Sequence, residues 1–346
     1  MPRPHDARDR RPSRIFSCAP VLILSLLLVA AVARWPTFFG PATAAQKPAP
    51  TSDQDDVLRV RTDLITVPTR VLDKRGQRVG GLTRDDFTLQ VDGRPTQLDH
   101  FSAGTDRVAM AFLLDASGSA REYLAQQRDA ALALFARFGS GSQISVIRFG
   151  EKIQVAVPFT NDSDQARRGF DFGARSGNHS AIFDSAAAAL KLFEQRKKDA
   201  LERRIIILTS DGLDNASTSS AARVVERARA DDVSFYLIHF PLFAPNGEHL
   251  GIRPPAKGFR DLADKTGGRY FVAGDVKQAL NPDATYDLSP IFLAIADDLA
   301  GQYLLGFYPD EASRDGRHHA IDVRLRHDSG GRVVKTLRDG YSLNTQ

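Results

Sequence analysis

Cysteine is almost absent from this sequence. The 346 residues include one, Cys18, and it precedes the first apolar run. A single cysteine excludes an internal disulfide, and a mature chain that begins after that run would have no thiolate metal site and no cysteine nucleophile. The fold must therefore be held together by a hydrophobic core, and the length is sufficient for one large domain or two modest ones.

An excess of one charge sign is also absent once the first 45 residues are set aside. The chain carries 46 Lys and Arg against 42 Asp and Glu. Residues 1–45 hold six Arg and two Asp, which accounts for the formal net charge of +4. The remaining 40 basic and 40 acidic residues balance, so the sequence predicts no extended basic surface and no nucleic-acid partner.

The motifs of common catalytic sites are missing too. None of the eight His occurs in a His-x-x-x-His or His-Glu-x-x-His spacing. Ser117 lacks a Gly-x-Ser-x-Gly elbow, and the chain has no Gly-x-x-x-x-Gly-Lys phosphate loop. Asp115 has no second Asp two residues later, so a phosphoryl-aspartate mechanism is unsupported. We therefore predict that the protein is not an enzyme.

Residues 1–45 have the three-part layout of a secretory signal. Arginines precede an apolar run over residues 21–33, and small residues follow at 42–45. An uncleaved membrane anchor is the competing interpretation, because residues 15–33 carry no charge and are about long enough to span a bilayer. Pro20 and the short apolar run favour the signal. We expect an exported protein of the periplasm, cell envelope or medium, with membrane contact only through this segment if it is uncleaved.

The rest of the chain predicts an α/β fold with β-rich ends. Residues 46–56 have the composition of a linker, and residues 57–105 and 301–346 show short alternating strands with turn signals. Residues 106–300 alternate apolar runs with helical patterns, as a doubly wound, mostly parallel sheet requires. We expect the two β segments to pair into one flanking β-sandwich. Within the central region, residues 241–257 are expected to form a loop and residues 259–266 a helix.

The most informative stretch covers residues 108–119. A nearly continuous apolar run ends in Asp115, Ser117 and Ser119. The run is predicted to be a buried parallel strand, so these side chains follow its C-terminal end, where open α/β sheets place their ligand sites. Three oxygen side chains on one loop suit a hard cation such as Mg²⁺. The alternative is a helix cap, in which Ser117 or Ser119 caps a helix that begins near residue 121.

Two further segments carry residues of the same kind. Residues 203–215 contain a second predicted buried strand, whose apolar run ends in Asp211 and Gly212. Between the two runs, Ser180 stands at the mouth of an Ala-rich helix predicted over residues 181–194. Five oxygen side chains would then converge from three strand ends, and an oxygen-only site selects Mg²⁺, Mn²⁺ or Ca²⁺ over Zn²⁺.

Together these residues resemble the metal-ion-dependent adhesion site of the von Willebrand factor type A domain, whose pattern is Asp-x-Ser-x-Ser, then Thr, then Asp in Asp-Gly. The matching residues are Asp115, Ser117, Ser119, Ser180 and Asp211. Ser180 stands where the family has Thr and keeps the hydroxyl. The β segments are similar to those of the von Willebrand factor A-related proteins described from Acidobacteria. The resemblance implies the α/β fold and an exported location, and it assigns no activity.

By this resemblance, the three serine hydroxyls would ligate the cation, while Asp115 and Asp211 would act through water. The cation would complete its shell with an Asp or Glu carboxylate of a partner protein. We therefore expect an exported, metal-dependent adhesion or interaction module. The alternatives are a structural envelope protein whose site is vestigial or only stabilising, and a hydrolase whose metal activates water.

Four polar residues near these motifs are expected to have other roles. His179, beside Ser180, is expected to be a solvent-exposed loop residue at the rim of the site. Asp184 is expected to cap or pair locally. Asp214 and Asn215 are expected to form turns.

Overall fold

The computed structural model describes residues 63–117, 121–171, 179–246, 249–279, 281, 285–327 and 330–344. The expected signal or anchor and the linker lie outside the described residues, and so does Ser119. All described residues belong to one compact unit, Arg59–Gln346. In the part of the chain that is described, no helix is long and apolar enough to cross a membrane.

The central sheet has six strands in the order β12-β9-β8-β5-β6-β7. Every neighbouring pair is parallel except β6 with β7, which is antiparallel and leaves β7 as an edge strand. The predicted fold class, an α/β protein with a mostly parallel central sheet, is confirmed. The strands are β5 (Val108–Asp115), β6 (Gln143–Phe149), β7 (Gln154–Thr160), β8 (Arg203–Ser210), β9 (Val233–His239) and β12 (Arg269–Val272).

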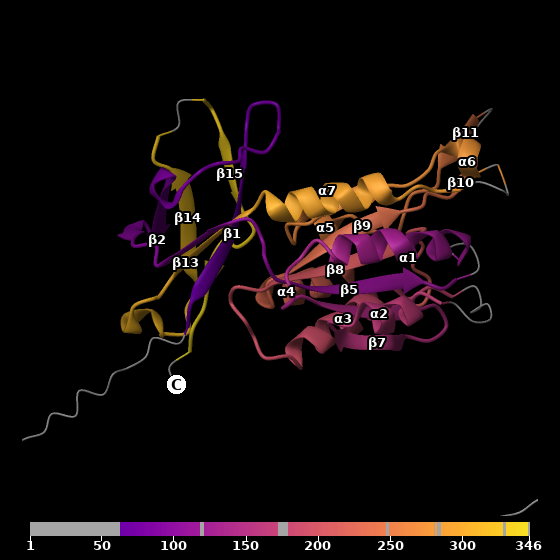
Figure 1. Cartoon of the computed structure of the whole chain (residues 1–346), viewed down its shortest axis with the longest axis horizontal. Helices are drawn as coiled ribbons and strands as arrows, with labels where there is room; N and C mark the ends of the chain where they lie inside the picture. The colour runs from indigo at the N-terminus through magenta and orange to yellow at the C-terminus, as the bar shows by residue number, and fades with distance from the viewer. Residues whose placement is uncertain are drawn as a thin grey trace, which may run out of the picture. The chain divides into compact units, whose positions relative to one another are not determined.

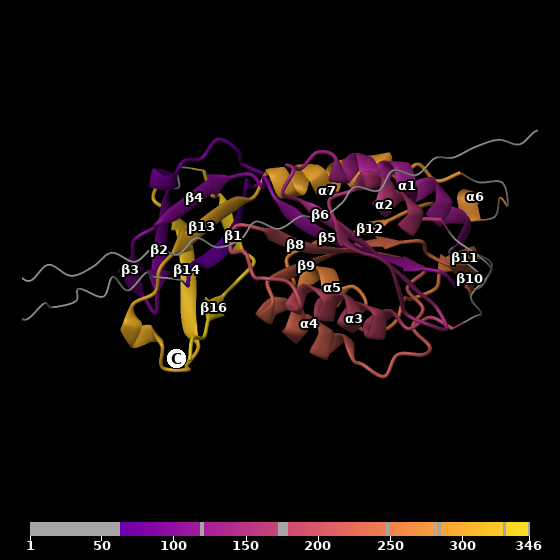
Figure 2. The same ribbon diagram turned by 60° about the horizontal axis from the view of Figure 1, so that its bottom comes forward.

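Both faces of this sheet are covered by helices, as Figure 2 shows. Strand β5 sends Met110, Phe112 and Leu114 into one core and its alternate residues into the other, which is why its sequence is continuously apolar. Helices α1 (Arg121–Phe135), α2 (Ser163–Gly169) and α7 (Ser289–Ala300) cover the first face. Helices α3 (Ile182–Glu194), α4 (Ala221–Ala230) and α5 (Asp261–Asp264) cover the second.

Strands from before and after the central sheet form a separate β unit of two four-stranded sheets, in the orders β15-β1-β13-β4 and β16-β14-β2-β3 (Figure 1). Strand β1 pairs antiparallel with β13, with Ile65 opposite Phe307. The two sheets enclose one core around Val67, Phe87 and Leu305. The pairing joins the described strands of the two predicted β segments, while the boundaries assigned to those segments stay predictions. The strands are β1 (Ile65–Leu72), β2 (Phe87–Val91), β3 (Arg94–Thr96), β4 (His100–Ala103), β13 (Tyr303–Phe307), β14 (His319–Leu325), β15 (Val333–Thr336) and β16 (Gly340–Tyr341), with short 3₁₀ turns η1 (Arg84–Asp86) and η2 (Glu311–Ser313).

The expected loop over residues 241–257 is wrong in part, because it contains a hairpin of β10 (Phe243–Asn246) and β11 (His249–Ile252). The prolines and glycines of this stretch obscure the alternating apolar and polar pattern that would have predicted strands. A two-stranded sheet leaves the outer edge of each strand unpaired, which is where a proline such as Pro245 is tolerated. The helix expected over 259–266 is reduced to α5, and a one-turn helix, α6 (Val276–Ala279), was not predicted.

A buried histidine in the β unit makes its stability depend on pH. His319 Nδ1 lies 2.8 Å from Asp92 Oδ2, and its Nε2 lies 3.1 Å from Asp315 Oδ1. The hydrogen bond to Asp92 is the main reason that the pKa of His319 is raised above 6.5. Because the folded-state pKa is the higher one, the stabilisation is complete below the unfolded-state value and is lost as pH rises through the folded-state value.

We therefore expect His319→Gln to lower the free energy of unfolding more at pH 6 than at pH 9. Urea unfolding at the two pH values measures the difference. His318→Gln, at the exposed neighbouring position, is the matched control and should change the free energy of unfolding by less than about 0.5 kcal/mol. An equal loss at both pH values for His319→Gln would contradict the charge argument and leave only a packing role.

Candidate metal site

Three chain segments meet at the C-terminal edge of the central sheet. Asp115 is the last residue of β5 and is fully buried. Ser210 ends the neighbouring strand β8, and Asp211 follows it. Ser180 lies two residues before the start of α3 at Ile182. The parallel pairing of β5 with β8 places both strand ends at the same edge of the sheet.

The carboxylate of Asp115 is the centre of this arrangement. Its Oδ2 accepts hydrogen bonds from the hydroxyls of Ser180, at 3.1 Å, and Ser210, at 2.7 Å. Its Oδ1 accepts one from the backbone N–H of Ser117, at 3.0 Å. Residues 65 and 95 positions away thus contact one carboxylate. Of the five predicted site residues, the structure brings together Asp115, Ser117 and Ser180, with Asp211 adjacent, and Ser119 lies outside the described residues.

Burial makes the ionised form of Asp115 costly. The loss of solvent is the largest cause that raises the pKa of Asp115, and the negative charge of Asp211 raises it further. Hydrogen bonds from the Ser210 hydroxyl and the Ser117 backbone N–H oppose these effects. Two nearby carboxylates at a water-poor position would be stabilised by a cation placed beside them.

The hydroxyl of Ser117 is buried, and it makes no hydrogen bond of normal geometry within the described part of the chain. It still lies close enough to the Asp115 carboxylate to favour the ionised acid. A buried hydroxyl without a partner is uncommon and needs an explanation. The helix-cap alternative does not explain the buried Ser117 hydroxyl, because no described backbone N–H of α1 donates a hydrogen bond to it.

A loop after β8 fixes the position of Ser180. Asn215 Oδ1 accepts the backbone N–H of Ser180 at 2.9 Å, and the Ser180 carbonyl accepts the N–H groups of Asn215 and Ala216 at 3.1 and 3.2 Å. Asp214 accepts the backbone N–H of Phe183 at 3.0 Å. These bonds agree with the prediction that Asp214 and Asn215 shape the loop.

Two other predictions concern residues at the margin of this loop. The local role expected for Asp184 is wrong, because its carboxylate accepts the N–H groups of Thr218 and Ser219, 34 and 35 positions away, at 2.9 and 2.8 Å. His179 is exposed, which agrees with the expected solvent-facing position.

Two residues that support the site were not predicted. Ser210 binds Asp115 directly, and its only sequence signal is its place before Asp211 at the end of an apolar run. His239, at the end of β9, is 1% exposed. Its Nε2 lies 2.9 Å from the carbonyl of Asp211, and its Nδ1 contacts the hydroxyl of Tyr270.

The protonation of His239 follows from these contacts. Burial lowers its pKa, so the ring is neutral. A carbonyl can only accept, so Nε2 carries the proton and donates to Asp211, while Nδ1 accepts from Tyr270. The imidazole thereby holds the backbone that carries the Asp211 carboxylate.

The donor set is hydroxyl-rich. Among the described residues there is no group of three or more His, Cys, Asp or Glu side chains that could hold a metal ion. Any cation here would depend on serine oxygens in addition to two carboxylates.

The sequence profile of the von Willebrand factor type A domain matches residues 110–213. The matched region contains Asp115, Ser117, Ser180 and Asp211. The chain contains a von Willebrand factor type A domain. No curated protein matches the chain.

Solved structures with a similar fold include the proximal thread matrix protein 1 of the mussel byssus. One structure of it has 17% identity and a TM-score of 0.45, covering 57% of this chain and 49% of that one, so this chain spans about half its length. Another, with a zinc-occupied MIDAS motif, has 16% identity and a TM-score of 0.45 over the same shares. An aerotolerance-related membrane protein from Bacteroides fragilis has 17% identity and a TM-score of 0.39, covering 56% of this chain and 98% of that one. At such low identity, these likenesses assign no ligand to this chain.

The residues of this von Willebrand factor A domain fit a divalent cation. Ser117 offers a buried hydroxyl without a hydrogen-bond partner among the described residues. Asp115 and Asp211 supply two negative charges close enough to repel each other. Oxygen donors of this type suit Mg²⁺, Mn²⁺ or Ca²⁺.

Proposed function

We propose that the protein is an exported, metal-dependent protein-binding module. The observation that supports this most is the Asp115 carboxylate, which accepts hydrogen bonds from the hydroxyls of Ser180 and Ser210 on separate segments. Beside it, the Ser117 hydroxyl has no hydrogen-bond partner among the described residues. A buried carboxylate and a buried hydroxyl without a partner cost free energy at this sheet edge unless a ligand binds them.

The hydrogen bonds explain how this chain would present its ligands. A serine hydroxyl has one proton and two lone pairs. Because Ser180 gives its proton to Asp115, its lone pairs remain available on the other side. Ser117 and Ser119 would supply two more hydroxyls, and Asp115 and Asp211 would bind through water and balance the charge. The bound cation would supply an electrophilic centre for an Asp or Glu carboxylate of the partner.

Titration calorimetry of the full chain with Mg²⁺ and Mn²⁺ tests the cation site. A pull-down from cell-envelope extract, with and without EDTA, tests partner capture. Saturable metal binding together with chelator-sensitive capture supports the proposal. Metal binding without any chelator-sensitive partner favours a stabilising site in a structural protein, and no metal binding at millimolar concentration contradicts the whole proposal.

Two changes at Ser180 should have different effects on metal affinity. Ser180→Ala removes one hydroxyl and should weaken Mg²⁺ binding by about tenfold or more. Ser180→Thr keeps the hydroxyl, restricts χ1 and should leave the affinity equal or higher. Calorimetry on both variants measures the effect, with Ser140→Ala, at an exposed serine after α1, as the control. Unchanged affinity in Ser180→Ala would exclude this hydroxyl as a ligand.

A further inference from the structure

A cavity of about 1120 Å³ lies between the β unit and the N-terminal edge of the central sheet. Its walls include Ile65 and Pro68 of β1, Leu304 of β13, and Arg203, the first residue of β8. Strand β8 ends at Ser210 in the candidate metal site, so at about 3.3 Å per residue the two sites are roughly 23 Å apart. The cavity is therefore distinct from the metal site.

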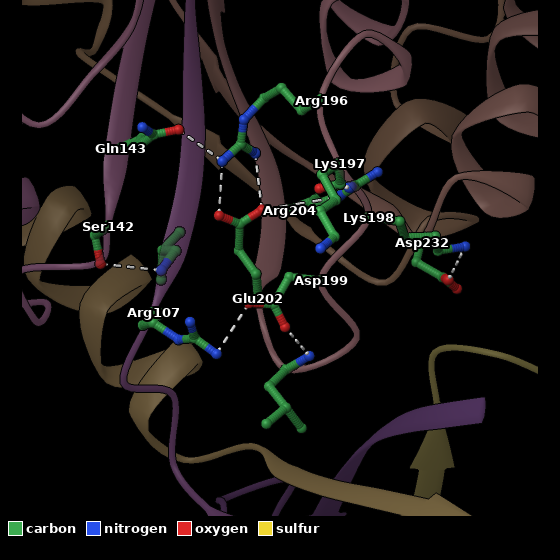
Figure 3. A network of polar contacts seen from close by, with 12 residues as sticks. Arg107, Ser142, Gln143, Arg196, Lys197, Lys198, Asp199, Glu202, Arg204 and Asp232 are labelled. Carbon is green, nitrogen blue, oxygen red and sulfur yellow. Dashed lines mark hydrogen bonds and ion pairs between the residues drawn. The ribbon is translucent and has the colours of Figure 1, made fainter. Parts of the chain in front are cut away.

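Most acidic groups in the cavity wall are already neutralised by cations of the protein. Figure 3 shows Glu202 paired with Arg196, and Asp199 paired with Arg107. Each carboxylate oxygen of Glu202 lies 2.8 Å from a guanidinium nitrogen of Arg196, and Asp199 Oδ2 lies 3.0 Å from Arg107 Nη2. The other three pairs of this kind are Asp63 with Arg314, Asp261 with Lys265, and Asp339 with Arg229. Glu226, on the exposed side of α4, is the remaining acid apart from Asp232.

The carboxylate of Asp232 forms ion pairs with two cations. Its Oδ2 lies 2.9 Å from Arg338 Nη2 and 3.3 Å from Lys198 Nζ. One carboxylate thus balances only half of the positive charge beside it. This part of the wall carries a surplus of positive charge.

Arg203 adds to that surplus. Its side chain is buried, and its guanidinium makes one hydrogen bond within the described residues, from Nη2 to Ser234 Oγ at 3.3 Å. Its Nε is buried without a hydrogen-bond partner among the described residues. Asp232 and Asp298 act on Arg203 through their charges, but neither forms an ion pair with it in the described part of the chain. An arginine remains charged in proteins and presents five N–H donors, so most of its donors are unused.

The buried acid Asp298 cannot serve as the missing partner. Asp298 and Arg70 both act electrostatically on Arg203. Asp298 Oδ2 already accepts Arg70 Nη2 at 2.5 Å, Tyr236 OH at 2.7 Å and Gln302 Nε2 at 3.1 Å. Four cations (Arg70, Arg203, Lys198, Arg338) therefore face two carboxylates (Asp232, Asp298) in this region.

We propose that Arg203 anchors a second ligand site, for a small organic anion bound through carboxylate or phosphate oxygens. The planar guanidinium suits either group. The cavity, at about 1120 Å³, is slightly larger than typical small-molecule sites of roughly 300–1,000 Å³, and apolar residues of β1 and β13 would contact the rest of the ligand. This site is independent of the metal site and of the function proposed for it.

The test titrates the full chain with inorganic phosphate and, separately, with succinate, at constant ionic strength. Divalent cations are removed beforehand on a chelating resin, so that no cation at the Asp115 site can bind the anions and no soluble carboxylate chelator competes with them. The melting temperature of the wild type should rise in a saturable way with at least one anion. In Arg203→Met the apparent affinity should fall by about tenfold or more. Arg137→Met, which removes the same charge at an exposed position after α1, should respond like the wild type.

Arg203→Lys keeps a buried cation and serves if Arg203→Met does not fold. It should bind the anion more weakly than the wild type, because an ammonium group cannot form the paired bonds of a guanidinium. A response to phosphate alone or to succinate alone supports the site and identifies the group that it prefers. The proposal is wrong if neither anion stabilises the wild type saturably, or if both Arg203 variants respond as the wild type does.

Discussion

Asp115→Asn should abolish Mg²⁺ and Mn²⁺ binding while the fold is retained. The change removes one of two negative charges at the site and keeps an oxygen that can accept the hydroxyls of Ser180 and Ser210. Loss of that charge should weaken cation binding by at least about 100-fold, since even groups outside the first shell of ligands change metal affinity by 10–100-fold. Calorimetry with each metal, together with circular dichroism, measures the two effects.

The same variant should be more stable than the wild type when metal is absent. Burial and the neighbouring Asp211 raise the pKa of Asp115, which means that its ionised form is disfavoured in the folded protein. A neutral amide removes that cost, but its NH2 group then faces the Ser117 N–H in place of an acceptor. The free energy of unfolding should therefore rise by a small amount, about 0.5–1 kcal/mol. Urea unfolding in EDTA measures it. Binding sites commonly trade stability for function in this way.

Asp162→Asn is the matched control for both measurements. Asp162 is exposed and caps α2 through the N–H groups of Asp164 and Gln165, a role that Asn performs as well. Metal binding and stability should therefore match the wild type. If Asp115→Asn binds Mg²⁺ as the wild type does, the adhesion-site interpretation fails, and if it is less stable in EDTA, the carboxylate has a structural role.

The sequence predicts the central sheet well because its strands are buried on both faces. The apolar runs at residues 108–114 and 205–208 correspond to β5 and β8, and the polar residues that follow them lie at the edge where parallel strands end. The contact of Ser180 with Asp115 follows from the same topology, once the helix after Ser180 is placed beside the sheet. Local patterns were sufficient for these features.

Features that depend on distant partners carry no local signal. His239 belongs to the candidate site only because β9 ends beside the Asp211 loop, and nothing near His239 in the sequence indicates this. The hairpin of β10 and β11 is hidden by its proline and glycine content. The buried pair of Arg70 and Asp298 joins residues 228 positions apart, and in the sequence Asp298 looks like Asp297 beside it.

That pair gives the prediction with the largest effect on stability. Asp298 lies on α7 and is 3% exposed. Its Oδ2 accepts hydrogen bonds from Arg70 of β1, Tyr236 of β9 and Gln302, so one carboxylate joins the β unit to the central sheet. Asp298→Ala would leave the Arg70 guanidinium and the Tyr236 hydroxyl buried without this acceptor. We expect the free energy of unfolding to fall by about 3–5 kcal/mol, the usual cost of breaking a buried ion pair from one side.

Asp297→Ala is a closely matched control, since the same residue type changes one position away on the exposed side of α7. It should alter stability by less than about 0.5 kcal/mol. Asp298→Asn should fall between the two, because the amide oxygen still accepts one or two of the hydrogen bonds but no longer balances Arg70. Urea unfolding of the three variants measures the order. If Asp298→Ala were no less stable than Asp297→Ala, the β unit would be held to the sheet by apolar packing and not by this carboxylate.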